Sequence, residues 1–265
     1  MSRLLEWEDH LWEDPDGGRI ILHGVLPTVV HPQAMRPRMQ WDGLALVAGE
    51  DDLEVWEFED KSEKESAGIN LTEAMLGGGA TRLYLERLML LEEVSGGRFP
   101  DPEPWRLLRL ARKHGRNVYN LEPPLDDEAW VEHLGEEADY LTRWRTLLKI
   151  PRQGRRFGKL LKQARALSSP PPSGPVELQA ASALAAAWWW LLEESLSPEL
   201  RMSRDRRICA RLRGAMADLR TELGADATLL VPSPQVRVGE LLAILDAGIE
   251  PEIAKVCGSS DGEEE

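Results

Sequence analysis

Short apolar runs that end near glycine predict strands at several points along the chain. Arg19–His23 and Gly43–Ala48 are two such runs, and each has the length of a strand buried on both faces. Leu53–Phe58 alternates apolar and acidic residues, a period-two pattern typical of a half-exposed edge strand. Asn117–Leu121, which follows a predicted helix and Gly115, and Thr228–Val231 also have strand length. We therefore expect strands near both ends of the chain.

Helical spacing of apolar residues occupies most of the chain between these runs. We expect helices over Leu71–Leu76, Thr81–Val94, Trp105–His114, Asp126–Leu148, Phe157–Leu167, Val176–Glu194, Pro198–Leu223 and Val238–Ala247. Asp126 or Asp127 fits the N-cap of its helix, because a side-chain carboxylate accepts hydrogen bonds from the free amides there. Asp60–Ser66 predicts a charged loop, and Gly77–Gly79 predicts a flexible connector.

The order of these elements predicts an α/β fold with a mixed, partly parallel sheet and flanking helices. The local evidence is the helix Trp105–His114, then Gly115 in the C′ position, then the strand Asn117–Leu121. A helix that leads directly into a strand is typical of layered folds with parallel pairing. The last strand, Thr228–Val231, must pair with the early strands in order to be buried.

This pairing predicts one discontinuous core with a helical insertion. Residues 1–125 and 224–257 would form the α/β core, and residues 126–223 would form a helical cap. The Pro-rich stretch 168–175 reads as a linker within the cap. Residues 258–265 are rich in Gly, Ser and Glu, so we expect a disordered tail there.

Composition restricts the class of protein. The longest apolar run, Ala183–Leu192, is too short for a membrane span, which needs about 20 residues, and the acidic N-terminus lacks the apolar segment of a signal peptide. Cys209 and Cys257 form neither a disulfide framework nor the paired spacing of a zinc site. We therefore predict a cytoplasmic protein and no cofactor, although a divalent metal remains possible.

Charge is distributed unevenly along the chain. The net charge is −14, yet Arg143–Arg165 holds nine basic residues and no acidic one, with Trp144 and Phe157 between them. The basic side chains that we take as candidates for anion binding are Arg143, Arg145, Lys149, Arg152, Arg155, Arg156, Lys159 and Lys162. Such a segment would bind nucleic acid or another polyanion. The alternative is a solvated surface that pairs with the protein's own acids or with a second copy, and the net charge opposes long-range approach to nucleic acid.

Three consecutive tryptophans interrupt the Ala-rich helix Val176–Glu194. Successive residues of a helix point in directions about 100° apart, so Trp188, Trp189 and Trp190 cannot share one face. We predict that they contribute to a homo-oligomer or to contact with a protein partner, because Trp is enriched at interfaces. A thick internal helix is the equal alternative.

Five blocks of the chain resemble the TraB/TIKI-type α/β family, which is related to the erythromycin-esterase and ChaN-like folds. The family opens with an apolar strand into G-T-A-H and a second strand of the type P-D-x-V-x-x-E; here Ile20–Pro27 and Trp41–Val47 match in order and spacing. The family's central helix–Gly–strand unit matches Trp105–Leu121 followed by Glu122-Pro123-Pro124. Its E-R-D helix matches Ser203-Arg204-Asp205, and its final strand into G-A-G-H matches Leu229–Gln235.

The chain departs from that family at the residues associated with a metal-dependent hydrolytic site. The two motif histidines fall on Pro27 and Gln235, the second motif glycine falls on Pro232, and Val47 stands at the position of the early glutamate. Proline has no side-chain donor, and glutamine is a poor ligand that does not act as a general base. The resemblance therefore implies a scaffold that has kept its fold and lost its chemistry.

Several residues remain as catalytic or metal-binding candidates. The catalytic candidates are Glu122, Arg204, Asp205 and Gln235, and the metal candidates are His23 and His31. Arg204 and Asp205 would form a pair that orients an anionic group, or one solvated pair among many charges on their helix. Glu122 follows a strand, where α/β proteins place site residues, although an ordinary loop carboxylate also fits. His23 and His31 read more simply as a strand-end and a loop histidine.

Three hypotheses of function follow. The first is a non-catalytic TraB/TIKI-like scaffold that acts as a binding or interaction protein. The second is a divergent metal-dependent hydrolase, a peptidase or esterase, that uses His23, His31, Glu122, Arg204 and Asp205. The third is a polyanion or nucleic-acid binder that works through residues 143–165.

Overall fold

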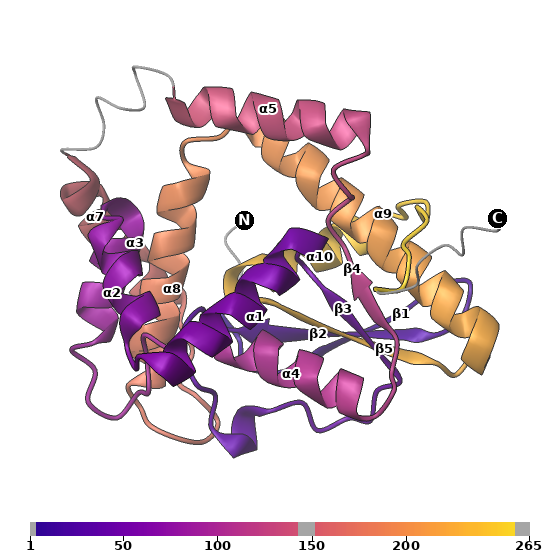
Figure 1. Ribbon diagram of the computed structural model, residues 1–265, viewed down its shortest axis with the longest axis horizontal. Coiled ribbons are helices and arrows are strands. Elements are labelled where there is room, and N and C mark those ends of the chain that lie inside the picture. The colour runs from indigo at the N-terminus through magenta and orange to yellow at the C-terminus, as the bar shows by residue number, and fades with distance from the viewer. Residues whose placement is uncertain (1–3, 143–151, 258–265) are drawn as a thin grey trace.

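The protein folds around one five-stranded sheet of order β1-β2-β5-β3-β4, as seen in a computed structural model that describes residues 4–142 and 152–257 (Figure 1). The strands are β1 (His10–Glu13), β2 (Arg19–Val25), β3 (Gly43–Leu46), β4 (Val118–Asn120) and β5 (Thr228–Pro234). β1 runs antiparallel to β2, and the other neighbours are parallel. The α/β class with a mixed, mostly parallel sheet is confirmed.

The central strand β5 comes from the C-terminal part of the chain. It pairs with β2 from Arg19↔Thr228 to Val25↔Pro234, and on its other edge Gly43 and Leu44 of β3 lie opposite Leu229 and Leu230. The prediction that the last strand joins the early ones is therefore correct, and β5 separates the β1–β2 pair from the β3–β4 pair.

Helices account for most of the remaining described residues. They are η1 (Gln33–Met35), α1 (Glu50–Glu65), α2 (Ile69–Leu76), α3 (Gly79–Leu88), α4 (Pro102–Lys113), α5 (Glu128–Thr142), α7 (Gln153–Leu167), α8 (Leu178–Glu193), α9 (Pro198–Leu223) and α10 (Gln235–Asp246). The N-cap prediction for α5 holds, because Asp127 Oδ1 accepts a hydrogen bond from Trp130 N at 2.9 Å. Gly115 has a φ of 61° after α4, as a C′ glycine requires.

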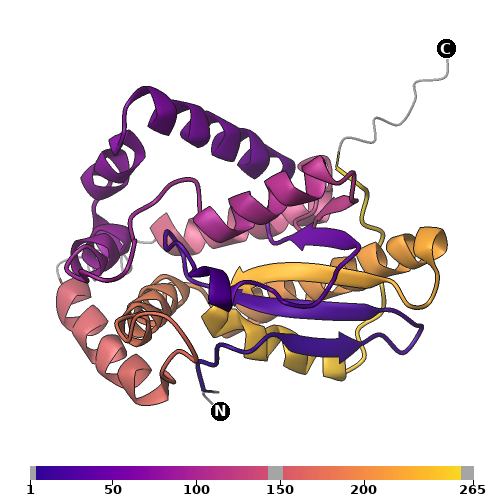
Figure 2. The ribbon, with the colours of Figure 1, turned by 90° about the horizontal axis from the view of Figure 1, so that it is seen from below.

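The two faces of the sheet are covered by different helices (Figures 1 and 2). On one face, Leu107, Leu108 and Ala111 of α4 pack with Leu44 of β3 and Leu230 of β5. On the other face, the buried side of α9 and the apolar side of α10 pack on Leu229 and Val231 of β5. Since alternate residues of β5 point to opposite faces, an unbroken apolar run at Leu229–Val231 is what a strand buried on both sides requires.

A second group of helices lies beyond one end of the strands (Figure 2). α3, α7 and α8 pack together, and their core includes Tyr84, Phe157 and Ala187. Leu26 and Val29, which follow β2, belong to the same cluster. This group of helices therefore rests on the carboxyl end of β2.

The range predicted as a helical cap, 126–223, contains α5, α7, α8 and α9. α9 differs from the rest of that range because it packs directly on the sheet through Leu212, Met216 and Leu219. Residues 168–175 lie between α7 and α8, and Ser168 forms a β-bridge with Leu5. The predicted tail, 258–265, lies outside the described residues.

The expected edge strand at Leu53–Phe58 is wrong, because this segment is part of α1. Six residues that alternate apolar and acidic positions also fit a helix that lies mostly in solvent, and only Leu53 of α1 is buried. Gly49 and the acids Glu50, Asp51 and Asp52 mark the helix N-terminus, where negative charge is favourable. The expected charged loop Asp60–Ser66 is accordingly the last part of α1 and its C-cap.

The actual edge strand, β1, was not predicted from the sequence. Its four residues, His10–Glu13, alternate between partly buried and exposed positions and carry no apolar run. Four residues with only two apolar side chains, set among acids, are too short a pattern to indicate a strand.

The segment after α10 lies along α9 at a position occupied by glycine. Glu252 N donates to Ala210 O at 2.9 Å, and Arg211 Nη1 donates to Ile253 O at 3.0 Å. A Cβ atom on Gly214 would lie 1.7 Å from Glu252 O, so this close approach of two backbones requires glycine.

No helix formed by residues 4–142 and 152–257 combines the length and the apolar character needed to cross a membrane.

Candidate functional site

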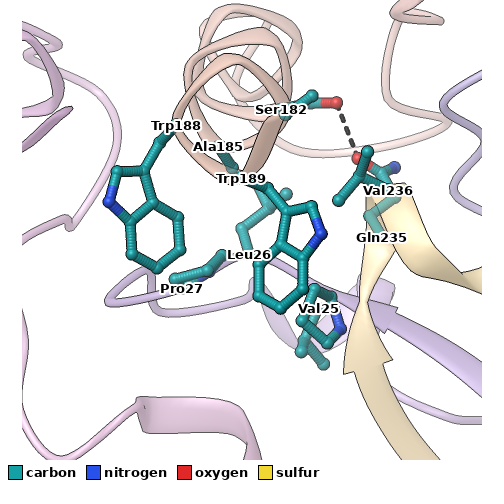
Figure 3. Close-up of a pocket in the computed structure, with 11 residues that line it drawn as sticks. Val25, Leu26, Pro27, Ser182, Ala185, Trp188, Trp189, Gln235 and Val236 are labelled. Carbon is teal, nitrogen blue, oxygen red and sulfur yellow. Dashed lines mark hydrogen bonds between the residues drawn. The ribbon is translucent and has the colours of Figure 1, made fainter. Parts of the chain in front are cut away.

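The carboxyl ends of β2 and β5 lie side by side, and the two turns that follow them border one small cavity. Pro27 and Gln235 both line it, opposite Ser182 and Ala185 of α8 (Figure 3). Its volume is about 10 Å³, barely the space of one water molecule. Side chains therefore fill the space between Pro27 and Gln235.

Gln235 is held at both ends of its side-chain amide. Its Oε1 accepts a hydrogen bond from Ser182 Oγ at 2.6 Å, and its Nε2 donates to Glu6 O at 2.6 Å (Figure 3). The residue is only 7% exposed. Gln235 thus joins the N-terminal segment, α8 and the start of α10, and both amide groups are already engaged.

A much larger groove opens next to this cavity. It has a volume of about 1240 Å³ and lies between the N-terminal segment, α8, the start of α9, and α10. Its apolar lining includes Leu4, Leu5, Trp189, Trp190, Met202, Val236, Leu242, Ala243 and Ile249. Its charged lining includes Glu6, His10, Glu193, Arg201, Asp205, Arg206 and Glu240. Three candidates from different parts of the sequence, Trp189–Trp190, Asp205 and Gln235, therefore meet in one groove.

The tryptophan triplet divides between this groove and the helical group. Trp188 stacks on Tyr84 with ring centroids 5.4 Å apart, and its indole nitrogen lies 3.4 Å from Thr81 Oγ1. Trp189 and Trp190 line the groove, and the guanidinium of Arg237 lies 5.2 Å from the ring centroid of Trp189. Trp188 points toward Pro27 (Figure 3), away from the groove lining. Oligomerisation through these residues stays a prediction.

Arg204 and Asp205 belong to a chain of buried ion pairs at the wall of the groove. Arg204 Nη2 donates to both oxygens of Glu193, at 2.9 and 3.0 Å, and Arg237 Nη2 donates to Asp205 Oδ1 at 2.6 Å. Asp205 is 6% exposed and Arg237 is 4% exposed. Arg204 Nε also donates to Asp205 Oδ1 at 3.4 Å, so the two predicted residues do form a pair, and each has a further partner that sequence reasoning had missed.

Arg237 also has unused hydrogen-bonding capacity, because its Nε is buried without a hydrogen-bond partner in the described part of the chain. Arg237 stands two residues after Gln235, near the start of α10. A buried charge at that point needs a carboxylate partner from another element. Asp205 on α9 fulfils that need.

Two carboxyl groups near this network have altered acidity. Burial, and then the nearby charge of Asp52, raises the pKa of Glu122. Burial, and then the charge of Asp205, raises the pKa of Glu240. Glu122 follows β4 as expected, and its backbone amide donates to Ala48 O at 3.3 Å. Glu122 does not line the groove, but it lies close enough to Arg237 and Arg204 for their positive charges to act against the rise in its pKa.

His23 and His31 lie together on the opposite side of the strand ends. Their ring centroids are 5.8 Å apart. His23 Nδ1 donates to Asp9 Oδ1 at 2.6 Å, and its Nε2 lies 3.9 Å from Glu103 Oε1. His31 Nε2 accepts a hydrogen bond from Leu26 N at 3.2 Å. Both rings are almost fully buried, so the two histidines join a polar cluster in the interior.

The chemistry of this histidine cluster favours a structural role for His31. Burial, followed by the charge of His23, lowers the pKa of His31 to about 4, so the ring is neutral near pH 7. A neutral ring is also what the hydrogen bond from Leu26 N requires, because Nε2 must be an acceptor. Within residues 4–142 and 152–257, no three His, Cys, Asp or Glu side chains are arranged to hold a metal ion.

The predicted anion-binding segment is only partly described. Arg143, Arg145 and Lys149 lie outside the described residues. The remaining candidates, Arg152, Arg155, Arg156, Lys159 and Lys162, are exposed at the start and along α7. Arg156 is paired with Glu194, as the alternative of internal charge pairing predicts. The other four form no ion pair with another residue in the described part of the chain, and polyanion binding here stays a hypothesis.

Comparison with known proteins gives no further guidance: no family model, no curated protein and no solved structure matches this chain. The likeness to the TraB/TIKI-type family therefore remains a hypothesis that rests on its five sequence blocks.

Proposed function

We propose that this chain is a binding or interaction protein on a TraB/TIKI-like scaffold, and that its groove between α8, α9 and α10 holds an amphipathic segment of a protein partner. The observation that carries the proposal is the groove itself. At about 1240 Å³ it exceeds the usual range of about 300–1,000 Å³ for small-molecule sites. An extended, mostly apolar groove of that size suits a peptide or helix.

The lining of the groove supports this occupant. Gly239 and Ala243 of α10 and Ala247 at its C-cap stand four residues apart and line the groove, so this side of the helix presents only small side chains to it. Arg206 and Glu240 also line it, and neither makes an ion pair with another described residue. An apolar floor with charged groups beside it is the arrangement that an amphipathic segment matches.

The polar residues of the groove support binding in preference to hydrolysis. Gln235 is fixed by Ser182 and Glu6, and Asp205 is neutralised by Arg237. Groups already committed to internal pairs stabilise the walls of a site, whereas a general base needs a free acceptor near the substrate. Both cysteines are free thiols, which fits the proposal of a cytoplasmic protein.

The test is selection of peptides from a displayed random library on the intact protein, followed by measurement of each peptide's Kd. We expect Trp190→Ala to weaken selected peptides roughly tenfold to a hundredfold, because loss of a central aromatic anchor typically costs about 2 kcal/mol or more. Ala243→Arg should block the floor and have at least as large an effect.

Trp188→Ala is the matched control, because Trp188 packs against Tyr84 outside the groove lining. It should leave peptide affinity within about twofold while lowering thermal stability. Peptides that bind all three variants equally well, or a library that yields no binder, would contradict the proposal. Light scattering of the wild type and Trp190→Ala would show whether the partner is a second copy.

A further inference from the structure

A second concave surface lies along α4, on the opposite face of the sheet from the groove. It has a volume of about 670 Å³. Its cationic side chains are Arg98, Arg106, Arg109 and Lys113. Arg106, Arg109 and Lys113 are spaced three and four residues apart, so they lie on one side of the helix.

Three of these cations are not neutralised within the described chain. Arg98, Arg109 and Lys113 are exposed and form no ion pair with any carboxylate in residues 4–142 or 152–257. Arg106 is paired with Glu103. In a protein with a net charge of −14, an unneutralised cluster of this kind is unusual, because nearby acids would normally be available to pair with it.

The one acidic residue in the lining is already engaged. Asp60 is paired with Lys64, and its Oδ1 accepts a hydrogen bond from the indole of Trp105 at 3.2 Å. It therefore fixes Trp105 at the wall of the surface, and its charge is compensated by Lys64. Arg109 also lies near Asp60, and neither Arg109 nor Lys113 forms an ion pair with a carboxylate in the described part of the chain.

The rest of the lining is apolar. Val30, Phe99, Trp105 and Leu110 contribute side chains between the cations. A volume of about 670 Å³ lies within the usual range for small organic ligands. Apolar walls beside several cations fit a ligand with an apolar or aromatic body and a multiply charged anionic group. A phosphate carries about −1.5 to −2 charges near neutral pH and accepts several hydrogen bonds at once.

We propose that this surface binds a small organic phosphate of the nucleotide type, with the phosphates held by Arg98, Arg109 and Lys113 and the apolar body against Phe99 and Trp105. The site is separate from the groove between α8 and α10, so it does not depend on the function proposed for that groove. Its size favours a free small molecule over a nucleic-acid strand, which would extend far beyond it.

Calorimetric titration of the full chain with three probes tests the proposal. ADP carries both a ring system and phosphates, pyrophosphate carries only the charge, and adenosine carries only the ring system. We expect ADP to bind at least about tenfold more tightly than pyrophosphate or adenosine, with affinity that falls as salt is raised, because ion pairs at the surface are screened.

The double variant Arg109→Gln with Lys113→Gln should weaken ADP binding at least about tenfold, because each removes a charge-assisted hydrogen bond. Arg112→Gln is the matched control: it lies on the same helix, is paired with Glu57 and does not line the surface. It should change the affinity by less than about twofold. Thermal unfolding of all variants checks that each is folded.

Three outcomes would overturn the proposal. The first is that the wild type fails to bind ADP at millimolar concentration. The second is that Arg112→Gln weakens ADP binding as much as the double variant does. That result would indicate that ADP is attracted to positive charges on the protein in general and not to this surface. The third is that a single-stranded oligonucleotide binds while ADP does not, which would indicate an extended nucleic-acid surface.

Discussion

At the scale of single residues, this protein depends on positions where size or charge leaves little freedom. Gly214 is the clearest case, because the backbone of Glu252 occupies the space where a side chain would begin. Arg213 is another: it is 6% exposed, donates to Asp14 Oδ1 at 3.0 Å and also bonds Ile249 O. Removal of one partner of such a buried pair leaves an uncompensated charge, which is costly.

Gly214→Ala should destabilise the protein by about 2 kcal/mol or more, because the added methyl group forces α9 and the segment around Glu252 apart. Chemical denaturation measures this change. Gly158→Ala on α7 is the matched control, since a Cβ there meets no atom within 4 Å. That variant should gain up to about 1 kcal/mol from better helix propensity. Equal effects of the two substitutions would show that the close approach at Gly214 is unimportant.

Asp101 predicts a specific pH dependence of stability. Burial raises its pKa from 3.8 to about 6, although the hydrogen bond from Thr28 N at 2.7 Å acts in the opposite direction. Because the folded state holds the proton more tightly, its contribution to stability is full below about pH 4. It is lost as the pH rises through about 6.

Asp101→Asn keeps an acceptor for Thr28 and removes the charge. It should therefore become progressively more stable than the wild type between pH 4 and pH 7, by on the order of 2 kcal/mol at the upper end. Asp101→Ala removes the acceptor as well and should lose about 1–2 kcal/mol relative to Asp101→Asn at every pH. A constant difference between Asp101→Asn and the wild type across this range would disprove the assignment.

At the scale of elements, the N-terminal segment is fastened to the rest of the molecule by specific hydrogen bonds. Leu5 N donates to Leu167 O at 2.9 Å, Trp7 Nε1 donates to Ser169 O at 2.9 Å, and Glu6 O accepts from Gln235. Gln235 is therefore a connector between three elements. Its side chain has a structural role at this position.

Gln235→Ala should cost about 1–3 kcal/mol, because it leaves the buried hydroxyl of Ser182 and the carbonyl of Glu6 without partners. Hydrogen exchange should show faster exchange at the amides of Leu5 and Ser169 than in the wild type. The double variant with Ser182→Ala should cost less than the sum of the two single variants, because the pair shares one bond. Additive costs would mean that the bond contributes little.

Prediction from sequence succeeded for elements with long apolar signals and failed where the signal was short. The unbroken apolar run Leu229–Val231, typical of a strand that is buried on both faces, predicted β5. The unit of helix, Gly115 and strand predicted α4 and β4. α1 was mistaken for a strand because only Leu53 is buried, so its pattern carried almost no helical period. Asp205 was identified through a sequence motif, whereas its partner Arg237 depends on the packing of α10 against α9, which no local pattern records.

At the scale of the whole molecule, the two surfaces proposed to bind ligands lie on opposite faces of one sheet. The groove next to Trp190 and Asp205 is formed with α8, α9 and α10, and the cationic surface of Arg109 and Lys113 is formed on α4. The α4 cations were visible in the sequence as basic residues at helical spacing. The longer basic run at 143–165 is a much stronger signal in the charge pattern, so the spacing of the α4 cations did not indicate a site.

The position of β5 has a consequence for folding during synthesis on the ribosome. A ribosome would release the β1–β2 hairpin and the β3–β4 pair long before the strand that bridges them, so each would expose an open, apolar edge in the meantime. Long-range pairing of this kind slows folding and invites aggregation of incomplete chains. Chaperone dependence during synthesis, and insolubility of any fragment that stops before Thr228, are what this arrangement of strands implies.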